Sequence, residues 1–207
     1  MRRLLIIGAG GHGRVVADIA KLCGQYQEIH FADDADIHTC GEYPVICTTR
    51  EALRFINDHD MVVAIGNNQT RKRISEELEA ASAHFATFVH PTAVIAADTI
   101  LGPGSVVMAN AVINCGSILG KGVIVNTAAT IDHDNQIGDY VHISPGVHLA
   151  GTVDIGSETW VGIGATVSNN VCICGGCVIG AGALVIRDIT VAGTYVGVPV
   201  VRKDSLS

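Results

Sequence analysis

The chain has 207 residues, which is enough for one or two compact domains. Its formal net charge is −7 and it has no basic run, which argues against nucleic acid or an anionic membrane as a partner. Aromatic residues make up only 4% of the chain whereas there are 24 glycines, a composition that suits a thin, tightly wound core.

Neither the N-terminal residues nor the cysteines point to export or to a bound metal. The apolar run 4–7 stops at Gly8, too soon for a signal peptide, and no segment is long enough to span a membrane, so we expect a cytoplasmic protein. Seven cysteines, an odd number, argue against a disulfide framework. Cys172, Cys174 and Cys177 are spaced like zinc ligands, but no fourth ligand converges on them, so we interpret them as packing residues and predict no metal.

The first 90 residues alternate between predicted strands and helices. The strands are expected at 4–7, 29–32, 44–47, 61–65 and 85–89, and the helices from the glycines after residue 7 to about Leu22, at 49–57 with Thr49 as N-cap, and at 70–83. This alternation indicates a parallel sheet with crossover helices. We therefore predict a small α/β, Rossmann-like domain over residues 1–90 that ends at His90-Pro91.

A glycine motif follows the first predicted strand. Gly8-x-Gly10-x-x-Gly13 precedes a helix, and Asp33 comes twenty residues later, as in dinucleotide-binding turns. Such a turn presents backbone N–H groups at the positive end of a helix, where phosphates bind. A domain of about 90 residues lacks the second half of a dinucleotide fold, which disfavours NAD. We therefore favour a nucleotide or nucleotide-sugar site, with a purely structural glycine turn as the alternative.

Polar residues also follow two other strands of this domain. Asp33-Asp34 and Gly66-Asn67-Asn68 are expected at the carboxyl edge of the sheet, beside the glycine turn. Carboxylates and amides could bind ribose or a base, but Asp and Asn are equally common in plain turns. Composition alone leaves both interpretations open.

From Ile95 onward every sixth residue is aliphatic, which is the period of a parallel β-helix. The sixteen residues are Ile95, Leu101, Val107, Ile113, Leu119, Val125, Ile131, Ile137, Ile143, Leu149, Ile155, Val161, Val167, Ile173, Ile179 and Val185. Four residues after each aliphatic stands a small residue, with Asn135 as the exception. Glycine often follows the aliphatic, at Gly102, Gly120, Gly138, Gly156, Gly162 and Gly180, and we expect it there to supply a positive φ at sharp corners.

Polar residues crowd into one hexapeptide of this repeat, Asp132-His133-Asp134-Asn135. His133 titrates near neutral pH and is the candidate general base. Either Asp132 or Asp134 could orient its ring, and the sequence does not decide between them. The alternative is a solvated corner with a surface histidine.

The chain resembles the left-handed β-helix acyltransferases, and in particular those that carry an N-terminal Rossmann-like domain. These are the sialic-acid O-acetyltransferases and the UDP-4-amino-sugar N-acetyltransferases of bacterial glycan synthesis, including the bacillosamine-pathway enzyme. The similar segments are Gly8-Ala9-Gly10-Gly11-His12-Gly13, Asp33-Asp34, Ile65-Gly66-Asn67-Asn68, Asn126-Thr127, Asp132-His133-Asp134, His142-Ile143-Ser144 and Tyr195-Val196-Gly197-Val198-Pro199. The resemblance implies a left-handed β-helix domain with a C-terminal extension over residues 91–207.

The resemblance also implies a homotrimer with active sites between neighbouring coils, His133 as general base and Asp134 as its acidic partner. Acetyl-CoA would contact His142, Gly151, Ile163 and Ala181, with the Gly151 N–H near the thioester carbonyl. Gly10, Gly11, His12, Asp33 and Asp34 match the nucleotide-sugar site. Two positions depart from the pattern: Asp134 stands where the bacillosamine-type enzymes have Glu, and Ala181 stands where Gly is usual.

We therefore predict an acetyltransferase that moves acetyl from acetyl-CoA to the 4-amino group of a UDP-linked amino-dideoxy sugar, by direct attack with His133 as base. The alternative reaction is O-acetylation of sialic acid or another sugar hydroxyl. The alternative outside enzymes is a nucleotide-sugar-binding scaffold. The acceptor sugar, the position acetylated and the pathway are left open.

Overall fold

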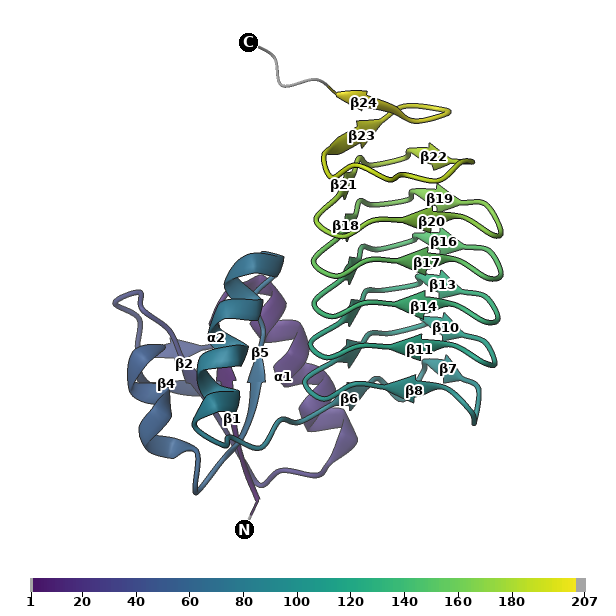
Figure 1. Ribbon diagram of the computed structural model, residues 1–207. Helices are drawn as coiled ribbons and strands as arrows, with labels where there is room; N and C mark the ends of the chain where they lie inside the picture. The colour runs from purple at the N-terminus through teal and green to yellow at the C-terminus, as the bar shows by residue number, and fades with distance from the viewer. Residues whose placement is uncertain (1, 204–207) are drawn as a thin grey trace. The chain divides into compact units, whose positions relative to one another are not determined.

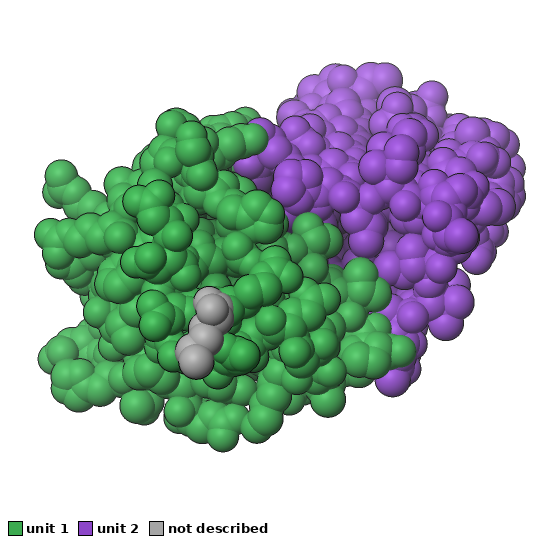
Figure 2. All heavy atoms as spheres, turned by 90° about the horizontal axis from the view of Figure 1, so that it is seen from below, with its two compact units in different colours: residues 1–91 green, residues 92–207 purple. Residues whose placement is uncertain are grey.

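The computed structural model describes residues 2–203, which form two compact units, one ending at Pro91 and the other beginning at Thr92 (Figure 2). The first unit is built from alternating strands and helices and the second from very short strands that repeat along the chain (Figure 1). No helix within residues 2–203 has the length and apolar character needed to cross a bilayer.

The first unit is a largely parallel sheet with helices, as predicted, except that the last predicted strand, 85–89, is not one of its strands: only Phe85 pairs with the sheet, through an isolated bridge to Met61. Its elements are β1 (Arg3–Ile7), α1 (Gly11–Cys23), β2 (Glu28–Ala32), β3 (Thr39–Cys40), β4 (Tyr43–Cys47), the 3-10 helix η1 (Arg50–Phe55), β5 (Asp60–Val63), α2 (Asn68–Ala80) and β6 (Phe88–Val89). The sheet order is β3-β4-β2-β1-β5, parallel except for the β3–β4 pair. Strand β1 therefore lies where the chain changes direction across the sheet, which is where ligands bind in open α/β sheets.

Strand β1 forms the centre of this unit because both of its faces are apolar. Leu5 and Ile7 pack in one cluster with Ile74 and Leu78 of α2. Side chains alternate along a strand, so Leu4 and Ile6 point to the opposite face, and all four are fully buried. A continuous run of leucine and isoleucine of this kind is typical of a strand that is covered on both sides.

The helix predicted at 49–57 differs from the structure in length and in its cap. It is the shorter 3-10 helix η1, and Thr49 has helical dihedrals and makes no capping bond. The cap is Thr48, whose N–H and hydroxyl donate to the Glu51 carboxylate at 3.1 and 2.9 Å, while the Glu51 N–H donates to the Thr48 hydroxyl at 3.4 Å. This reciprocal pairing satisfies N–H groups that a helix end leaves unpaired, and Thr49 lies one residue too far along to make it.

The second unit is a three-sided coil whose strands stack in parallel (Figure 1). Face 1 consists of β7 (Val94–Ile95), β10 (Val112–Ile113), β13 (Thr130–Ile131), β16 (His148–Leu149), β19 (Thr166–Val167) and β22 (Leu184–Val185). Face 2 consists of β8 (Ile100–Leu101), β11 (Ile118–Leu119), β14 (Gln136–Ile137), β17 (Asp154–Ile155) and β20 (Cys172–Ile173). Face 3 contains β9 (Val106–Val107), β12 (Ile124–Val125), β15 (His142–Ile143), β18 (Trp160–Val161), β21 (Val178–Ile179), β23 (Thr194–Val196) and β24 (Val201–Lys203).

The inside of the coil follows the six-residue period. The predicted aliphatics from Val107 to Val185 are at most 3% exposed, and only Ile95 and Leu101, in the first coil, are half-buried. The small residues of the second row are buried as well from Ser105 onward. The left-handed β-helix fold is thus confirmed, and its cause is the pairing of one large with one small inward side chain on each side of each coil.

The expectation that the glycines after the aliphatics supply positive φ was wrong. Positive φ occurs two residues later, at Gly104 and at every sixth residue from there to Gly182, and Asn110, Ala128, Tyr140 and Glu158 adopt it as well as glycine. The glycines after the aliphatics are needed for a different reason, which is the close stacking of the coils. A Cβ on Gly138 would lie 2.6 Å from the backbone N of Ser157, and one on Gly162 would lie 2.6 Å from the backbone O of Ile179.

Candidate functional site

His133 lies on the corner of the coil between faces 1 and 2, with half of its side chain exposed (51%). Its Nδ1 is 2.8 Å from Oδ2 of Asp134, so Asp134 is the carboxylate that contacts the ring. Asp134 is one of the corner residues with positive φ (59°), a conformation that Asp tolerates better than most residues. The turn therefore directs its side chain back to the residue before it.

Asp132, the other candidate partner, orients the backbone of the corner instead. Its Oδ1 accepts the Asn114 amide and the His133 backbone N–H, each at 2.9 Å, and both bonds lower the pKa of Asp132. The hydrogen bond to Asp134 raises the pKa of His133. With Nδ1–H donating to the carboxylate, Nε2 is the nitrogen left with a lone pair to accept a proton.

Asn135, the polar exception in the small inward row, holds this corner from inside the coil. It is fully buried, and its side-chain N–H₂ donates to the carbonyls of Asp132 at 2.7 Å, His133 at 3.2 Å and Ala150 at 3.1 Å. Buried N–H groups persist only when they are hydrogen-bonded, and here the partners are two carbonyls of the corner itself and one carbonyl on the next coil. Asn135, which interrupts the small inward row, thus holds the backbone of the corner that carries His133.

Gly151 occupies the same corner one coil further along, directly against the imidazole. A Cβ on Gly151 would lie 2.5 Å from Nε2 and from Cε1 of His133. Among residues 2–203 the N–H of this glycine has no acceptor, whereas its carbonyl accepts from Asn170. Because Gly151 has no side chain, one edge of the His133 ring stays open, and the unpaired Gly151 N–H lies beside it.

The other residues assigned to acetyl-CoA lie elsewhere on the coil. His142 is on face 3, where its ring stacks on Trp160 with centroids 6.0 Å apart and planes 8° from parallel. Ile163 and Ala181 lie one above the other on the corner between faces 3 and 1, and both are exposed. In a three-sided coil, face 3 is opposite the corner that bears His133. One copy of the chain therefore does not bring His142 together with His133.

Face 3 also carries two exposed apolar side chains that sequence reasoning did not single out, Trp160 and Val178, and together with Ile163 of the adjoining corner they form an apolar strip. Trp160 is 47% exposed, Ile163 61% and Val178 37%. Trp160 and Val178 stand at the outward position just before an inward aliphatic, but Val or Ile is common at that position, as at Val94, Ile100 and Ile118, so the pattern alone did not mark them. An exposed apolar strip of this kind fits the pantetheine arm of a coenzyme A thioester.

The first unit contains a cavity of about 440 Å³ at the carboxyl end of β1. Six of the predicted substrate residues line it, namely Gly10, Gly11, His12, Asp33, Asp34 and Gly66. Thr49, Thr70 and Arg73 line it too and were missed. Thr70 and Arg73 lie on the face of α2 that also bears Ile74, and only the position of that helix shows that they reach the cavity.

The glycines of the turn divide into two kinds. A Cβ on Gly13 would overlap the carbonyl oxygen of Gly8, and one on Gly8, which has φ +105°, would lie 2.9 Å from the Ala64 carbonyl oxygen. These two glycines are required by the close approach of helix and strand. A Cβ on Gly10 or Gly11 would meet nothing within 4 Å. The described part of the chain therefore does not explain Gly10 and Gly11, and both line the cavity.

His12 is held neutral at the wall of this cavity. Its burial, followed by the charge of Arg71, lowers the pKa of His12 to about 4. Arg71 is itself buried and donates to the carbonyls of Ile65 and Gly66 at 3.0 and 3.2 Å. A buried, neutral imidazole beside a fixed cation suits an uncharged hydrogen-bonding partner or an anion better than a cation.

The polar residues at the strand ends have specific backbone partners. Asp33 accepts from the Ala9 N–H at 2.7 Å and the Ala35 N–H at 2.9 Å, and Asp34 accepts from the Thr49 N–H at 2.9 Å. Asn67 is the N-cap of α2, and Asn68 accepts from Arg71. Asn67 and Asn68 are thus engaged in holding the helix and, unlike Gly66, do not line the cavity.

Residues 2–203 contain no group of three or more His, Cys, Asp or Glu side chains that is arranged to hold a metal ion.

Comparisons with known proteins agree with both units. Residues 3–78 match the family described as PglD N-terminal domain. UDP-N-acetylbacillosamine N-acetyltransferase of Bacillus subtilis (strain 168) is 36% identical over 114 residues, which is 53% of this chain and 52% of that protein. The match thus spans about half the length of this curated relative.

Solved structures match over nearly the whole chain. The acetyltransferase domain of PglB from Neisseria gonorrhoeae FA1090, in complex with acetyl coenzyme A, is 44% identical with a TM-score of 0.94, covering 98% of this chain and 99% of that one. PerB from Caulobacter crescentus, in complex with CoA and GDP-perosamine, is 32% identical with a TM-score of 0.90, covering 99% of this chain and 98% of that one.

Proposed function

Because the chain belongs to the family of acetyl-CoA-dependent sugar N-acetyltransferases that join a PglD-type N-terminal domain to a β-helix, we propose that it acetylates an amino group of a nucleotide-linked sugar. The preferred acceptor is the 4-amino group of a UDP-linked amino-dideoxy sugar, by similarity to the bacillosamine-type relative. A cytoplasmic location is part of this proposal. The observation that supports it most is the His133–Asp134 pair beside Gly151 on an open corner of the coil.

The reaction proceeds by direct attack. The amine nitrogen attacks the thioester carbonyl carbon, His133 Nε2 takes a proton from that nitrogen, and the carbon–sulfur bond breaks to release the thiol of CoA, which receives the proton. Asp134 favours the protonated ring that forms during the step, as the raised pKa of His133 indicates. A base in this position contributes about 10²–10⁴-fold to the rate.

Gly151 supports the same step through its backbone. Its N–H is available to the oxygen of the thioester carbonyl, which becomes negatively charged as the amine attacks. Removal of one donor of this kind costs about 10²–10³-fold in other enzymes. The lack of a side chain at Gly151 also keeps the imidazole edge open to the substrate.

The cavity of the first unit is the proposed site for the nucleotide. The N-terminus of α1 and the Arg73 guanidinium in the cavity wall both favour a diphosphate. Gly10 and Gly11 let the backbone approach the ligand closely, since no neighbour restricts them to glycine. Neutral His12 and the carboxylates of Asp33 and Asp34 are suited to hydrogen bonds with a base and a ribose.

A homotrimer is the proposed assembly, because the residues assigned to acetyl-CoA lie on different sides of the coil. His133 and Gly151 lie on one corner, whereas His142 lies on the opposite face and Ile163 on another corner. One acetyl-CoA molecule can contact both groups only if they come from two copies of the chain. A protein that light scattering shows to be a monomer and that is active in the same buffer would contradict this arrangement.

Subunit mixing tests the shared site directly. His133→Ala and Ile163→Glu are each expected to be inactive alone, the first without its base and the second with a charge on the apolar strip. If the sites are shared, mixed assemblies of the two variants combine an intact His133 with an intact Ile163 and regain activity. If mixed assemblies remain as inactive as their parents, each subunit carries its own complete site.

The decisive assay for the function is a panel of UDP- and GDP-linked amino sugars, and of sialic acids, with acetyl-CoA. Release of free thiol measures turnover, and mass and NMR spectra of the product identify the acetylated atom. We expect turnover with a UDP-linked 4-amino sugar and acetylation at nitrogen. Turnover only with a hydroxyl acceptor, or none with any member, would overturn the proposal.

A further inference from the structure

Two cysteines flank the corner that follows β20, and the proposed function uses neither. Cys174 and Cys177 enclose Gly175-Gly176, and Gly176 has φ +72°. They are thus the first and fourth residues of a tight turn, whose Cα atoms lie within about 7 Å, a spacing that a disulfide can bridge. Their sulfur atoms are 3.6 Å apart with both thiols free.

The two thiols differ in access. Cys177 occupies the small inward row and is fully buried, whereas Cys174 is only half-buried. Burial raises the pKa of Cys177 to about 11. An oxidant from solution therefore meets Cys174 first, and Cys177 is positioned to attack the modified sulfur from inside.

We propose that Cys174 and Cys177 form a reversible dithiol–disulfide pair that exchanges with low-molecular-weight disulfides such as oxidised glutathione. The Cys174 thiolate attacks one glutathione sulfur, which forms a mixed disulfide and releases one glutathione thiol. Cys177 then loses its proton, attacks the Cys174 sulfur and releases the second glutathione thiol. Two protein thiols are oxidised and one glutathione disulfide is reduced, so no other reactant is needed.

The location gives the pair a structural consequence. This turn belongs to the last coil that has all three faces, where the Cys174 N–H donates to Ile189 and Val178 pairs with Thr194 of β23. Terminal repeats of such a stack lack a neighbour on one side and open first. A covalent link across this corner is therefore expected to slow the opening of residues 174–203 when the surroundings are oxidising.

The test exposes the full-length protein to glutathione buffers of increasing oxidising strength, quenches with acid, alkylates the free thiols and examines the peptides by mass spectrometry. We expect the peptide with both cysteines to lose two hydrogen atoms, and a dithiol reductant to reverse the loss. Cys172→Ser should show the same loss of two hydrogen atoms, which would exclude the exposed Cys172 as a partner in the disulfide. Cys174→Ala and Cys177→Ala should abolish it.

Both alanine variants are expected to fold. Ala165 and Ala183 already occupy the inward position of Cys177 in other corners, and Ala96 and Ala150 occupy the position of Cys174 directly after an inward aliphatic. Amide exchange of the oxidised protein should be slower than that of the reduced protein in residues 174–203 and unchanged around His133. The proposal is overturned if Cys174 ends as a stable glutathione adduct. It is also overturned if the alkylating reagent still modifies both Cys174 and Cys177 in a buffer oxidising enough for glutathione to have modified the exposed Cys172 and Cys115 completely.

A second inference comes from an independent observation, the bonding of the inward polar residues. Ser105, Ser117 and Thr159 each donate a hydroxyl to the carbonyl fifteen residues later, on the next coil, at 2.9, 3.0 and 3.2 Å. Asn135 makes the same kind of bond to Ala150 but also reaches Asp132 and His133 on its own corner. None of the three hydroxyl residues has these additional bonds in the described structure.

We infer that Asn135 is a positioning residue for His133, an inference that rests on the proposed role of His133 as base. Asn135 is fully buried and cannot touch a substrate, so it acts only through the corner that it holds. Its bonds keep the His133 carbonyl in place, and the Asp134 contact depends on the same turn. Small displacements of a base cost rate without weakening substrate binding.

Asn135→Ser tests this directly, because a serine there can keep the bond to the next coil, as Ser117 does, but cannot reach the corner. Ser105→Ala is the matched control, since it removes the same coil-to-coil bond far from His133. We expect Asn135→Ser to lower kcat about tenfold with KM for acetyl-CoA unchanged. We also expect the His133 pKa, measured by NMR titration of its ring protons, to fall toward about 6.5. Ser105→Ala should change neither.

The ring titration requires no turnover, so it separates this inference from the proposed function. An unchanged His133 titration and kcat in Asn135→Ser would refute the positioning role. The same would hold if Ser105→Ala lowered kcat by the same factor. If the wild-type protein acetylates no sugar but Asn135→Ser still shifts the titration, the proposed function fails while the structural role of Asn135 stands.

Discussion

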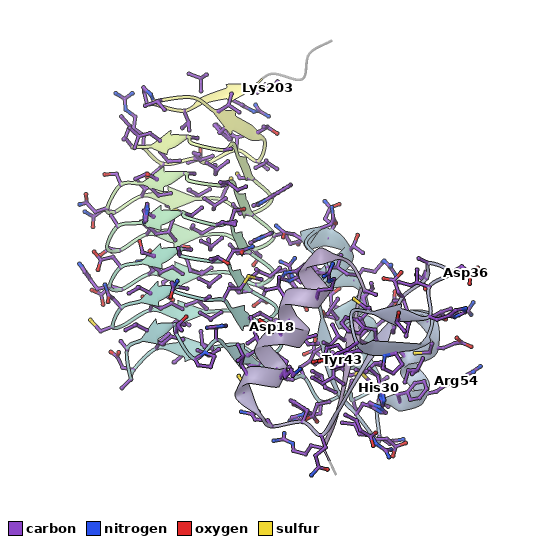
Figure 3. All side chains as sticks on the ribbon, turned by 180° about the vertical axis from the view of Figure 1, so that it is seen from behind. Asp18, His30, Asp36, Tyr43, Arg54 and Lys203 are labelled. Atoms are coloured by element: carbon purple, nitrogen blue, oxygen red, sulfur yellow. The ribbon has the colours of Figure 1, made fainter. Side chains whose placement is uncertain are left out.

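The two units of this chain encode their folds in different ways. In the coil one rule is repeated every six residues, and the side chains drawn in Figure 3 fill its interior in regular layers. In the first unit no spacing repeats, and strand, turn and helix each depend on local residues. In the coil the proposed chemistry lies where the rule is broken, at Asn135 and His133. In the first unit it lies within the motif that makes the fold, so fold and function must be separated residue by residue.

Glycine shows the same contrast. In the coil, Gly102, Gly138 and Gly162 allow close stacking of neighbouring coils and have no open side. In the first unit, Gly8 and Gly13 are required by packing, whereas Gly10 and Gly11 face open space at the cavity. Where neither packing nor backbone conformation within the chain requires glycine, close approach of a ligand is the best explanation for it.

The sharpest test of the coil is to remove the base. His133→Ala should reduce kcat at least about a hundredfold, because the attacking amine loses its proton acceptor. The side chain is half exposed and belongs to neither inward row of the coil, so the thermal midpoint should hardly change. Steady-state kinetics and calorimetry measure the two effects. Turnover close to that of the wild type would remove His133 from the mechanism.

The two kinds of corner glycine should differ strongly in stability. A Cβ on Gly156 would overlap the backbone N of Gly175, so Gly156→Ala is expected to cost about 1–3 kcal/mol or more. Gly164 has φ +65° but open space, and Ala128 already adopts this conformation, so Gly164→Ala should cost about 1 kcal/mol. Calorimetric unfolding of both variants compares them. Equal losses would contradict the stacking explanation.

The same comparison in the first unit separates fold from binding. Gly13→Ala should destabilise the unit, because the new Cβ would overlap the Gly8 carbonyl. Gly10→Val has room in the chain and should fold normally, but it should raise KM for the nucleotide sugar about tenfold if the phosphates approach the backbone there. Circular dichroism and steady-state kinetics measure the two effects. An unchanged KM in a folded Gly10→Val would place the nucleotide elsewhere.

The smallest expected effect is on pH dependence. His133 must be neutral to accept a proton, so kcat should fall as the pH drops through its pKa, which Asp134 holds above the usual value. Asp134→Ala removes that hydrogen bond, so the pKa falls and the acidic limb of the kcat profile should move to lower pH, by less than about one unit. Ala128 shows that alanine is accepted at a corner with positive φ. A limb that moves to higher pH would exclude Asp134 as the partner that raises the pKa.

Some parts of the site could be predicted and others could not. Gly10, Gly11, His12, Asp33 and Asp34 follow strands, so their common edge was predictable from the order of elements. Arg73 and Thr70 were not, because their approach to the cavity depends on how α2 lies on the sheet. Asn67 and Asn68 were ambiguous from composition, and their capping and arginine contacts appear only in three dimensions.

By itself the sequence determined the coil, because a period of six with alternating large and small residues is compatible with hardly any other packing of this chain. It also determined the alternation of strands and helices in the first unit. It singled out His133 and Asn135 as departures from the six-residue pattern of apolar and small residues. Only the tertiary structure decided which carboxylate contacts the imidazole, why the corner glycines are glycine, and on which side of the coil each site residue lies. The close approaches of the corner glycines join residues about eighteen apart, and the stacking of whole coils sets them rather than any local pattern. The contact between His133 and Asp134 joins consecutive residues, and it depends on the conformation of the corner turn.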